Sequence, residues 1–324
     1  MHNSECKHAH LKIGFIGFGR YGYGVMKAIL KSGHHNINNV YYLNINDYLE
    51  SNANDSDIHK KKVTLLKERL LPRFINSKKY KWDEHYLGLN NFMAKISSDH
   101  DDEGVLVISL NKNRGEKVFK KLKGYIKKNT WLFSSISNLK SSSIKDLLGD
   151  KCMVLRYLPN MGTKVGQGIT AVYVDVEPRH RKEGEVVFKK VFQGLGNIYF
   201  VDTEEQIIAA RVITGSTIGV IAYLAQSIAD AIGDLNIKGL GDEKEIAAEI
   251  VYHSMAGALA LGKDKEISTW GNIYDSIRIK PGPDEKPGTT DIIIKKMRDG
   301  KVPEVIKDSF RLSFEKCKKG ETEE

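Results

Sequence analysis

The sequence has few cysteines and no long uninterrupted apolar run, and both absences limit what the protein can be. Three cysteines in 324 residues, far apart in the chain, provide no disulfide framework, which favours a reducing compartment. We see no apolar run of about 18 or more residues, so we expect no transmembrane span. The opening residues, MHNSECKHAHLK, lack the apolar core of a secretory signal. We therefore expect a cytoplasmic protein.

Lysine gives the chain a formal net charge of +9, but no known nucleic-acid-binding motif accompanies the lysines. They gather in short clusters, such as residues 59–62 and 120–128, that are typical of solvated helix faces. A positive field of this kind also attracts anionic cofactors and substrates. We predict small anionic ligands, and no nucleic-acid partner, membrane partner or bound metal.

The first part of the chain has the pattern of an α/β domain. LKIGFIGFG, residues 11–19, is a short apolar run that ends in glycines, and apolar residues follow it at helical spacing. NVYYLNIN, residues 39–46, is rich in β-branched and aromatic residues and predicts a second strand. A strand, a helix and a strand within about 30 residues form a βαβ unit, which favours a parallel sheet.

The next 150 residues combine a polar stretch with further apolar runs. Residues 1–10 should form a flexible tail, and residues 47–102 a polar, partly disordered insertion with helices at 63–72 and 87–96. Beyond the insertion, apolar runs and helical spacing predict five strands and two helices, at 104–110, 130–136, 152–158, 168–176 and 197–202, and at 115–128 and 184–195. Residues 11–202 are therefore interpreted as one α/β domain.

After Asp202 the pattern becomes almost entirely helical, so residues 203–324 are predicted to form a second domain. STIGVIAYLAQSIADAIGDL, residues 216–235, and KEIAAEIVYHSMAGALALG, residues 244–262, are apolar on most faces. Such helices must be covered on several sides. A small helical domain achieves this best against a second copy of itself, so the pattern indicates a homodimer.

The glycines after the first predicted strand form the pattern G-x-G-x-x-G, at Gly17, Gly19 and Gly22. The first permits a tight turn, the second lets the backbone approach a pyrophosphate, and the third lets helix and strand pack closely. The helix N-terminus then faces the phosphate charge. The sequence therefore predicts a Rossmann domain that binds a dinucleotide.

The end of the second predicted strand usually decides between NAD and NADP. An acidic residue about 20 positions after the glycines would hold a ribose diol, whereas an arginine would favour a 2′-phosphate. Asn44 stands there and is neither, while Asp47 is the nearby carboxylate and the lysines at 60–62 could reach a phosphate. We expect NADP, with NAD as the alternative.

The most specific segment is VLRYLPNMGTKVGQGITAVYV, residues 154–174. It resembles the pyrroline-5-carboxylate reductase family, which has R-x-M-P-N…V-G-x-G-x-T-A at this place. Residues 213–231, 286–300 and 303–319 resemble the family's G-S-G-P-A-Y helix, its G-G-T-T element and its last helix, so the similarity runs from about Lys12 to Lys319. The resemblance implies a Rossmann domain followed by an all-helical dimerisation domain. It also implies hydride transfer from NAD(P)H to the C=N bond of L-pyrroline-5-carboxylate, giving proline.

The resemblance also assigns site residues. The cofactor would contact the glycine turn, the adenosine-ribose position, the residues after the fourth strand and the Pro-Asn corner, which are Gly17, Gly19, Arg20, Tyr21, Gly22, Asn44, Asn111, Lys112 and Asn160. Ser216, Thr289 and Thr290 are the catalytic candidates, and the paired threonines can bind a substrate carboxylate without adding charge. From local sequence alone, Ser216 fits a helix N-cap and Thr289 a turn-to-helix cap equally well.

Departures from the family pattern gather around the expected substrate pocket. The family's K-P-Q becomes Asn111-Lys112-Asn113, its A-A-G turn becomes residues 137–139 (SNL), and G-S-G-P-A-Y becomes GSTIGV. Two further hypotheses follow. The same fold could act on another imine or an oxo acid, or the protein could be a non-catalytic, nucleotide-binding dimeric regulator.

Overall fold

The computed structural model describes residues 11–17, 22, 24–26, 29, 40–43, 86–96, 104–127, 130–149, 152–235, 244–262, 269–277 and 288–322. They belong to two compact units. The sheet unit comprises Met1–Gly215 and Phe314–Glu324, and the helical unit comprises Ser216–Ser313. The sequence pattern changes at Asp202, whereas the units divide at Gly215, inside one continuous helix, α7 (Glu204–Asp234).

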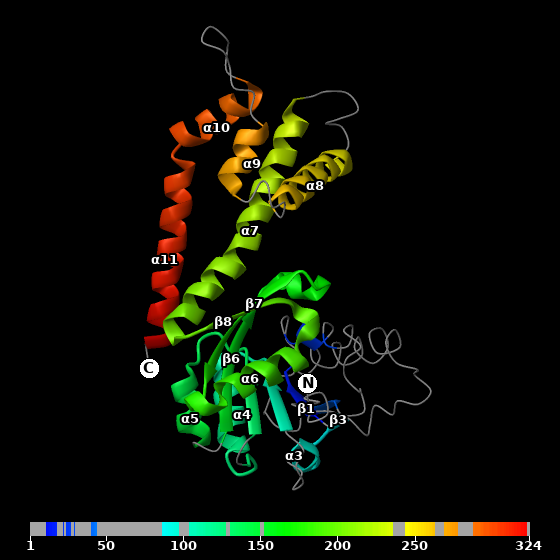
Figure 1. The fold of residues 1–324 in the computed structure, drawn as a ribbon, viewed down its shortest axis with the longest axis vertical. Helices are drawn as coiled ribbons and strands as arrows, with labels where there is room; N and C mark the ends of the chain where they lie inside the picture. The colour runs from blue at the N-terminus through cyan, green and yellow to red at the C-terminus, as the bar shows by residue number, and fades with distance from the viewer. Residues whose placement is uncertain are drawn as a thin grey trace, which may run out of the picture. The chain divides into compact units, whose positions relative to one another are not determined.

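The sheet unit contains an eight-stranded sheet, and this arrangement confirms the predicted α/β fold (Figure 1). Its strands are β1 (Lys12–Ile16), β2 (Val40–Leu43), β3 (Tyr86–Leu87), β4 (Gly104–Ile108), β5 (Thr130–Ser134), β6 (Cys152–Pro159), β7 (Gly168–Asp175) and β8 (Gly196–Val201). The spatial order is β3-β2-β1-β4-β5-β6-β7-β8. All neighbouring strands are parallel except β6 and β7, which are antiparallel. From β1 the chain first adds β2 and β3 on one side and then adds β4 on the other side of β1. Open α/β sheets bind ligands at such a switch point in the strand order.

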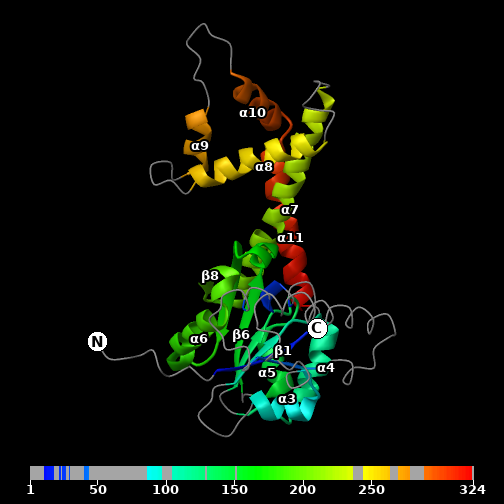
Figure 2. The same cartoon turned by 90° about the vertical axis from the view of Figure 1, so that its right-hand side faces the viewer.

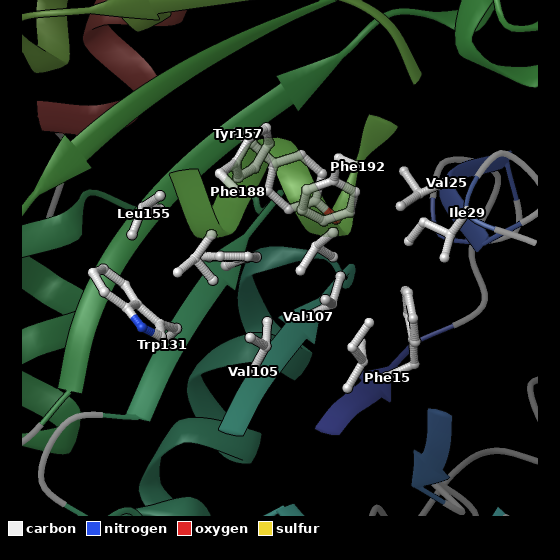
Figure 3. Packing of buried hydrophobic residues seen from close by; sticks show 14 of the residues in the cluster. Phe15, Val25, Ile29, Val105, Val107, Trp131, Leu155, Tyr157, Phe188 and Phe192 are labelled. Carbon is white, nitrogen blue, oxygen red and sulfur yellow. The ribbon is translucent and has the colours of Figure 1, made fainter. Parts of the chain in front are cut away.

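Helices cover both faces of this sheet because its central strands are apolar on both sides. On one face, α6 (Pro178–Val191) and the helical residues Val25 and Ile29 pack against the strands. On the other face lie α3 (Leu89–Ile96), α4 (Lys112–Leu122) and α5 (Ser141–Leu148). Figure 3 shows the first face, where the rings of Tyr157, Phe188 and Phe192 pack together.

Part of the predicted polar insertion belongs to this core. β3 and α3 fall within residues 47–102, and Phe92, Met93 and Ile96 are buried against the sheet. The helix predicted at 87–96 is confirmed, whereas the helix predicted at 63–72 and the tail at 1–10 lie outside the described residues. The sequence analysis missed α5, an eight-residue helix in the serine-rich segment before β6.

The helical unit contains most of α7 and α11 (Val302–Thr322), together with α8 (Lys244–Leu261), α9 (Trp270–Ile277) and α10 (Thr289–Asp299) (Figure 2). Among its described residues, the buried apolar side chains are Ala247, Val251 and Ile273. This unit therefore has little core of its own.

Helix α7 corrects the statement that the chain has no apolar run of about 18 or more residues. An 18-residue window in it has a mean hydropathy of 1.7, and 17% of that window is buried, so by length and composition α7 could cross a membrane. Glycine, serine and threonine residues such as Ser216, Thr217 and Gly219 interrupt the apolar run without making the segment strongly polar. The sequence therefore does contain an apolar segment of membrane-spanning length.

Candidate functional site

The glycine turn after β1 is too closely packed for larger residues. Gly17 has φ = 98°, a conformation that favours glycine, and a Cβ there would overlap the carbonyl oxygen of Ser109. A Cβ on Gly22, which is helical, would overlap the carbonyl oxygen of Gly17 and lie 3.2 Å from Ser109 Oγ. These two positions therefore meet the packing demands of a dinucleotide-binding turn. Gly19, Arg20 and Tyr21 lie outside the described residues, as does Asn44.

Two serines line the sheet edge beside this turn. Ser109 and Ser135 each stand one residue beyond a strand, β4 and β5, whose last residues are paired in register. The Ser109 amide donates to Ile16 O at 2.9 Å, and Ser135 Oγ donates to Ser109 Oγ at 2.9 Å. The carboxyl ends of β4 and β5 thus carry two hydrogen-bonded hydroxyl groups next to the glycine turn.

Asn111 and Lys112 lie at this same edge and begin α4. Asn111 is the N-cap residue, and its Oδ1 accepts a hydrogen bond from the Arg114 amide at 3.0 Å. The cap explains why α4 begins at Lys112, before the predicted start at 115. Asn111 therefore has a structural task at the position where the resemblance places the nicotinamide.

The side chain of Asn160 is occupied by internal hydrogen bonds. Its Oδ1 accepts from the amides of Gly162 and Ile169, both at 3.1 Å, and its Nδ2 donates to Thr214 O at 3.3 Å. The residue is 7% exposed. Asn160 therefore fixes the turn between β6 and β7 and ties it to α7.

A fully buried arginine organises the loop after β5. Arg156, on β6, forms an ion pair through Nη1 with Glu204, the first residue of α7. Its Nη2 donates to Ser137 O at 3.0 Å. Glu204 also accepts hydrogen bonds from Ser141, from the amide at 2.8 Å and from the hydroxyl. A buried arginine with these partners ties β6, α5 and α7 to one loop.

A second arginine holds the same loop from α7. Arg211 Nη1 donates to Ser137 O at 2.9 Å and to Asn138 Oδ1 at 2.7 Å. Residues 137–139 replace the family's A-A-G turn, which the resemblance places near the nicotinamide. The sequence pattern identified Arg156 but gave no sign of Glu204 or Arg211, since their partners are 48 and 74 residues away in the chain.

Tyr157 lies beneath this edge, next to Arg156 on β6. It is fully buried, and its ring centroid lies 4.9 Å from that of Phe192. Burial raises the pKa of the Tyr157 phenol above its ordinary value, and the Ser135 side chain opposes part of the rise. Tyr157 therefore stays neutral at physiological pH.

The catalytic candidates belong to the helical unit. Ser216 is exposed and lies well inside α7, so its interpretation as an N-cap is wrong. Thr289 and Thr290 are the first two residues of α10, after the N-cap residue Gly288. They offer two hydroxyls and amides that have no acceptor within the helix itself. Within the described residues, no group of three His, Cys, Asp or Glu side chains is placed to hold a metal ion.

No protein-family model matches the chain, and no curated protein matches it by sequence. Solved structures do resemble it along its length. A pyrroline-5-carboxylate reductase from Coxiella burnetii has 18% identity and a TM-score of 0.72, covering 96% of this chain and 98% of that one. The Plasmodium falciparum pyrroline carboxylate reductase with NADP bound has 15% identity and a TM-score of 0.70, with 97% and 99% covered. The 1-pyrroline-5-carboxylate reductase of Streptococcus pyogenes has 18% identity and a TM-score of 0.68, with 96% and 99% covered.

These similarities extend over both units, so they concern the whole fold and not the Rossmann domain alone. At such low identity they establish the architecture. The chain therefore has the fold of the pyrroline-5-carboxylate reductases, an N-terminal Rossmann domain followed by a helical domain.

Proposed function

We propose that this protein is a divergent pyrroline-5-carboxylate reductase that transfers hydride from NAD(P)H to the C=N bond of L-pyrroline-5-carboxylate, giving proline. The observation that carries the proposal is the fold likeness over the full length of three such reductases. The glycine turn supports it independently, because its packing leaves no room for side chains at Gly17 and Gly22.

The residues of the sheet unit fit a dinucleotide. The backbone at Gly17 and Gly22 would hold the pyrophosphate at the start of the following helix, at the switch point of the sheet. The cofactor, NADP by preference and NAD as the alternative, would supply the hydride. Arg156 and Arg211 hold the loop at 137–139 in a fixed conformation next to the expected nicotinamide position. The protein's contribution is therefore mainly binding and orientation.

The helical unit would bind the imino acid. Thr289 and Thr290 place two hydroxyls and the first amides of α10 at one helix end. A carboxylate is stabilised there by hydrogen bonds and by the helix dipole, without a second charged side chain. Ser216, exposed on α7, is the third candidate for contact with the substrate.

We also propose that the helical units of two chains form a homodimer in the cytosol. Exposed large apolar residues occur on every helix of this unit, including Tyr223 (74%), Tyr252 (69%) and Trp270 (66%). Helix α10 has no buried residue. Monomeric proteins rarely leave apolar patches larger than a few hundred Å² in contact with water. A second copy would cover α7 in water, without a membrane.

The test is oxidation of NADPH and NADH by the purified full-length protein, with and without L-pyrroline-5-carboxylate, and with proline detected as the product. Proline formation is the expected result. Cofactor binding without turnover would reject this substrate, and assays with other cyclic imines and oxo acids would then test the second hypothesis. Cofactor binding without turnover of any of them would leave the regulator hypothesis.

A glycine substitution tests the site itself. The variant Gly22→Val should abolish measurable cofactor binding, because its side chain would overlap the Gly17 carbonyl. Gly124→Val is the matched control, since a Cβ there meets nothing within 4 Å. Equal cofactor binding by both variants, at unchanged melting temperature, would contradict the assignment of the glycine turn.

A further inference from the structure

The short helix η5 (Met161–Val165), between β6 and β7, brings a lysine next to the helix that follows the glycine turn. A Cβ built on Gly24 would lie 3.0 Å from Lys164 Cγ and 3.7 Å from Lys164 Cε. The alkyl stem of Lys164 therefore lies against the backbone at Gly24, a helical residue two positions after Gly22. Its ammonium group is one bond beyond Cε, so it also lies close to Gly24.

The contact between Lys164 and Gly24 requires a glycine in the helix and a fixed turn that carries the lysine. A larger residue at Gly24 would push the lysine stem away, because 3.0 Å is already closer than ordinary van der Waals contact. The η5 turn is held by Asn160, whose Oδ1 caps it, and by Thr163, whose Oγ1 donates to Asn160 O at 2.8 Å. Gly166 closes it with φ = 75°. Lys164 thus projects from a rigid support.

The charge of Lys164 is not neutralised within the described part of the chain. No carboxylate there lies within ion-pair distance of its ammonium. By contrast, Lys145 is paired with Asp175 at 2.8 Å and Lys318 with Glu205 at 2.6 Å. A half-buried lysine beside a helix N-terminus adds a full positive charge to the partial charge of the helix.

We propose that Lys164 contacts the pyrophosphate of the dinucleotide cofactor, an inference that rests on the cofactor binding of the proposed function. The glycine turn supplies amide hydrogen-bond donors to the phosphates, and Lys164 supplies the charge. The position of the lysine, in the turn after β6, favours the pyrophosphate over a 2′-phosphate. Lys164 follows β6, whereas a 2′-phosphate is expected beyond β2, and these strands lie on opposite sides of β1.

The variant Lys164→Met keeps the length of the side chain and removes its charge. Binding of NADH, NADPH and ADP-ribose should be measured by isothermal titration calorimetry at low and at high salt. All three share the pyrophosphate, so the affinity for each should fall by at least about fivefold at low salt, as expected for the loss of a charge-assisted contact. Lys164→Arg should retain most of the affinity. Lys120→Met, which removes an exposed lysine from the last turn of α4, should change none of the three.

Other outcomes overturn the inference. A change below about twofold for all three ligands would show that the charge does not reach the pyrophosphate. Weaker binding of NADPH alone would place the lysine at a 2′-phosphate, and a higher KM for the imine alone would place it at the substrate. If the wild-type protein binds none of the three ligands, both this inference and the proposed cofactor site fail. Should Lys164→Met not fold, Lys164→Gln provides the same uncharged comparison.

Discussion

The two units of this chain differ in how well they bury their own apolar residues. In the sheet unit, strands β2, β4 and β5 are buried at every position, and helices cover both faces of the sheet. In the helical unit, α10 buries no residue, and α7 exposes Ile221, Tyr223 and Ile228. Both units are rich in apolar residues, so composition does not cause this difference. The sheet unit therefore has its own hydrophobic core, whereas the helical unit leaves apolar surface that the proposed dimer would cover.

The division also separates two sets of candidate site residues. The glycine turn, Lys164 and the arginines around the loop at 137–139 all belong to the sheet unit. Ser216 and the paired threonines belong to the helical unit. On the proposed function, one unit binds the cofactor and the other binds the imino acid. Substitutions in the two units should therefore affect different measurements.

The largest effect on stability is expected in the sheet unit, for Arg156→Met. This change leaves Glu204 without its buried partner, and breaking a buried ion pair costs about 3 to 5 kcal/mol. Since Glu204 is 25% exposed, we expect the lower end of that range. Hydrogen exchange of the β5 and β6 amides measures the loss in this unit separately. A control, Arg179→Met, removes an arginine that is 73% exposed and should change little. Equal protection in both variants would contradict the structural role of Arg156.

The next effect should appear in the helical unit, for a charge placed on the apolar face of α7. Ile221→Asp would bury an unpaired carboxylate in the proposed dimer interface, which we expect to weaken dimerisation by about 2 kcal/mol or more. Val186→Asp on α6 is the matched control, because Val186 is 37% exposed and Ile221 is 42% exposed. Sedimentation equilibrium of the two variants measures the dimer dissociation constant. The same constant for both would mean that α7 is not at the interface.

The sequence predicted the sheet unit better than its site. Runs such as GVLVISL and TWLFSSI predict buried strands because both faces of a parallel sheet are apolar. The strand β3, with two residues, and α5, in a serine-rich segment, are too short or too polar to be recognised in this way.

The sequence alone could not predict contacts between residues that are far apart in the chain. Arg156 stood in a recognisable motif, but its pairing with Glu204 depends on the meeting of β6 and α7. Ser216 matched a family motif and also fitted a helix start. The structure rules out a helix start at Ser216, because α7 already begins at Glu204 and runs through Ser216 without a break. Lys164 has no distinguishing pattern at all, and its position against Gly24 follows only from the turn that carries it.

A smaller effect, confined to catalysis, is expected for Thr290→Ala. On the proposed function, loss of one hydroxyl at the substrate carboxylate should lower kcat/KM by more than about tenfold, since a hydrogen bond to a charged group contributes roughly 1.5 to 3 kcal/mol. The affinity for NADPH should not change, because the proposed cofactor site lies in the other unit. Thr290→Ser keeps the hydroxyl and should retain most of the activity. If Thr290→Ala weakens NADPH binding instead, the separation of the two chemistries is wrong.

The smallest effect is expected for Asn111→Ala. Its Oδ1 caps α4, and loss of an N-cap costs about 1 kcal/mol of stability, which urea unfolding or hydrogen exchange of α4 can measure. Asn111→Ser retains a capping oxygen and should recover most of that loss. Cofactor affinity separates the two roles of this residue. If Asn111 only caps the helix, both variants should bind NADPH as the wild type does. Because an exposed asparagine with its carbonyl engaged still has a free amide group, weaker NADPH binding by Asn111→Ser at recovered stability would show direct contact with the cofactor.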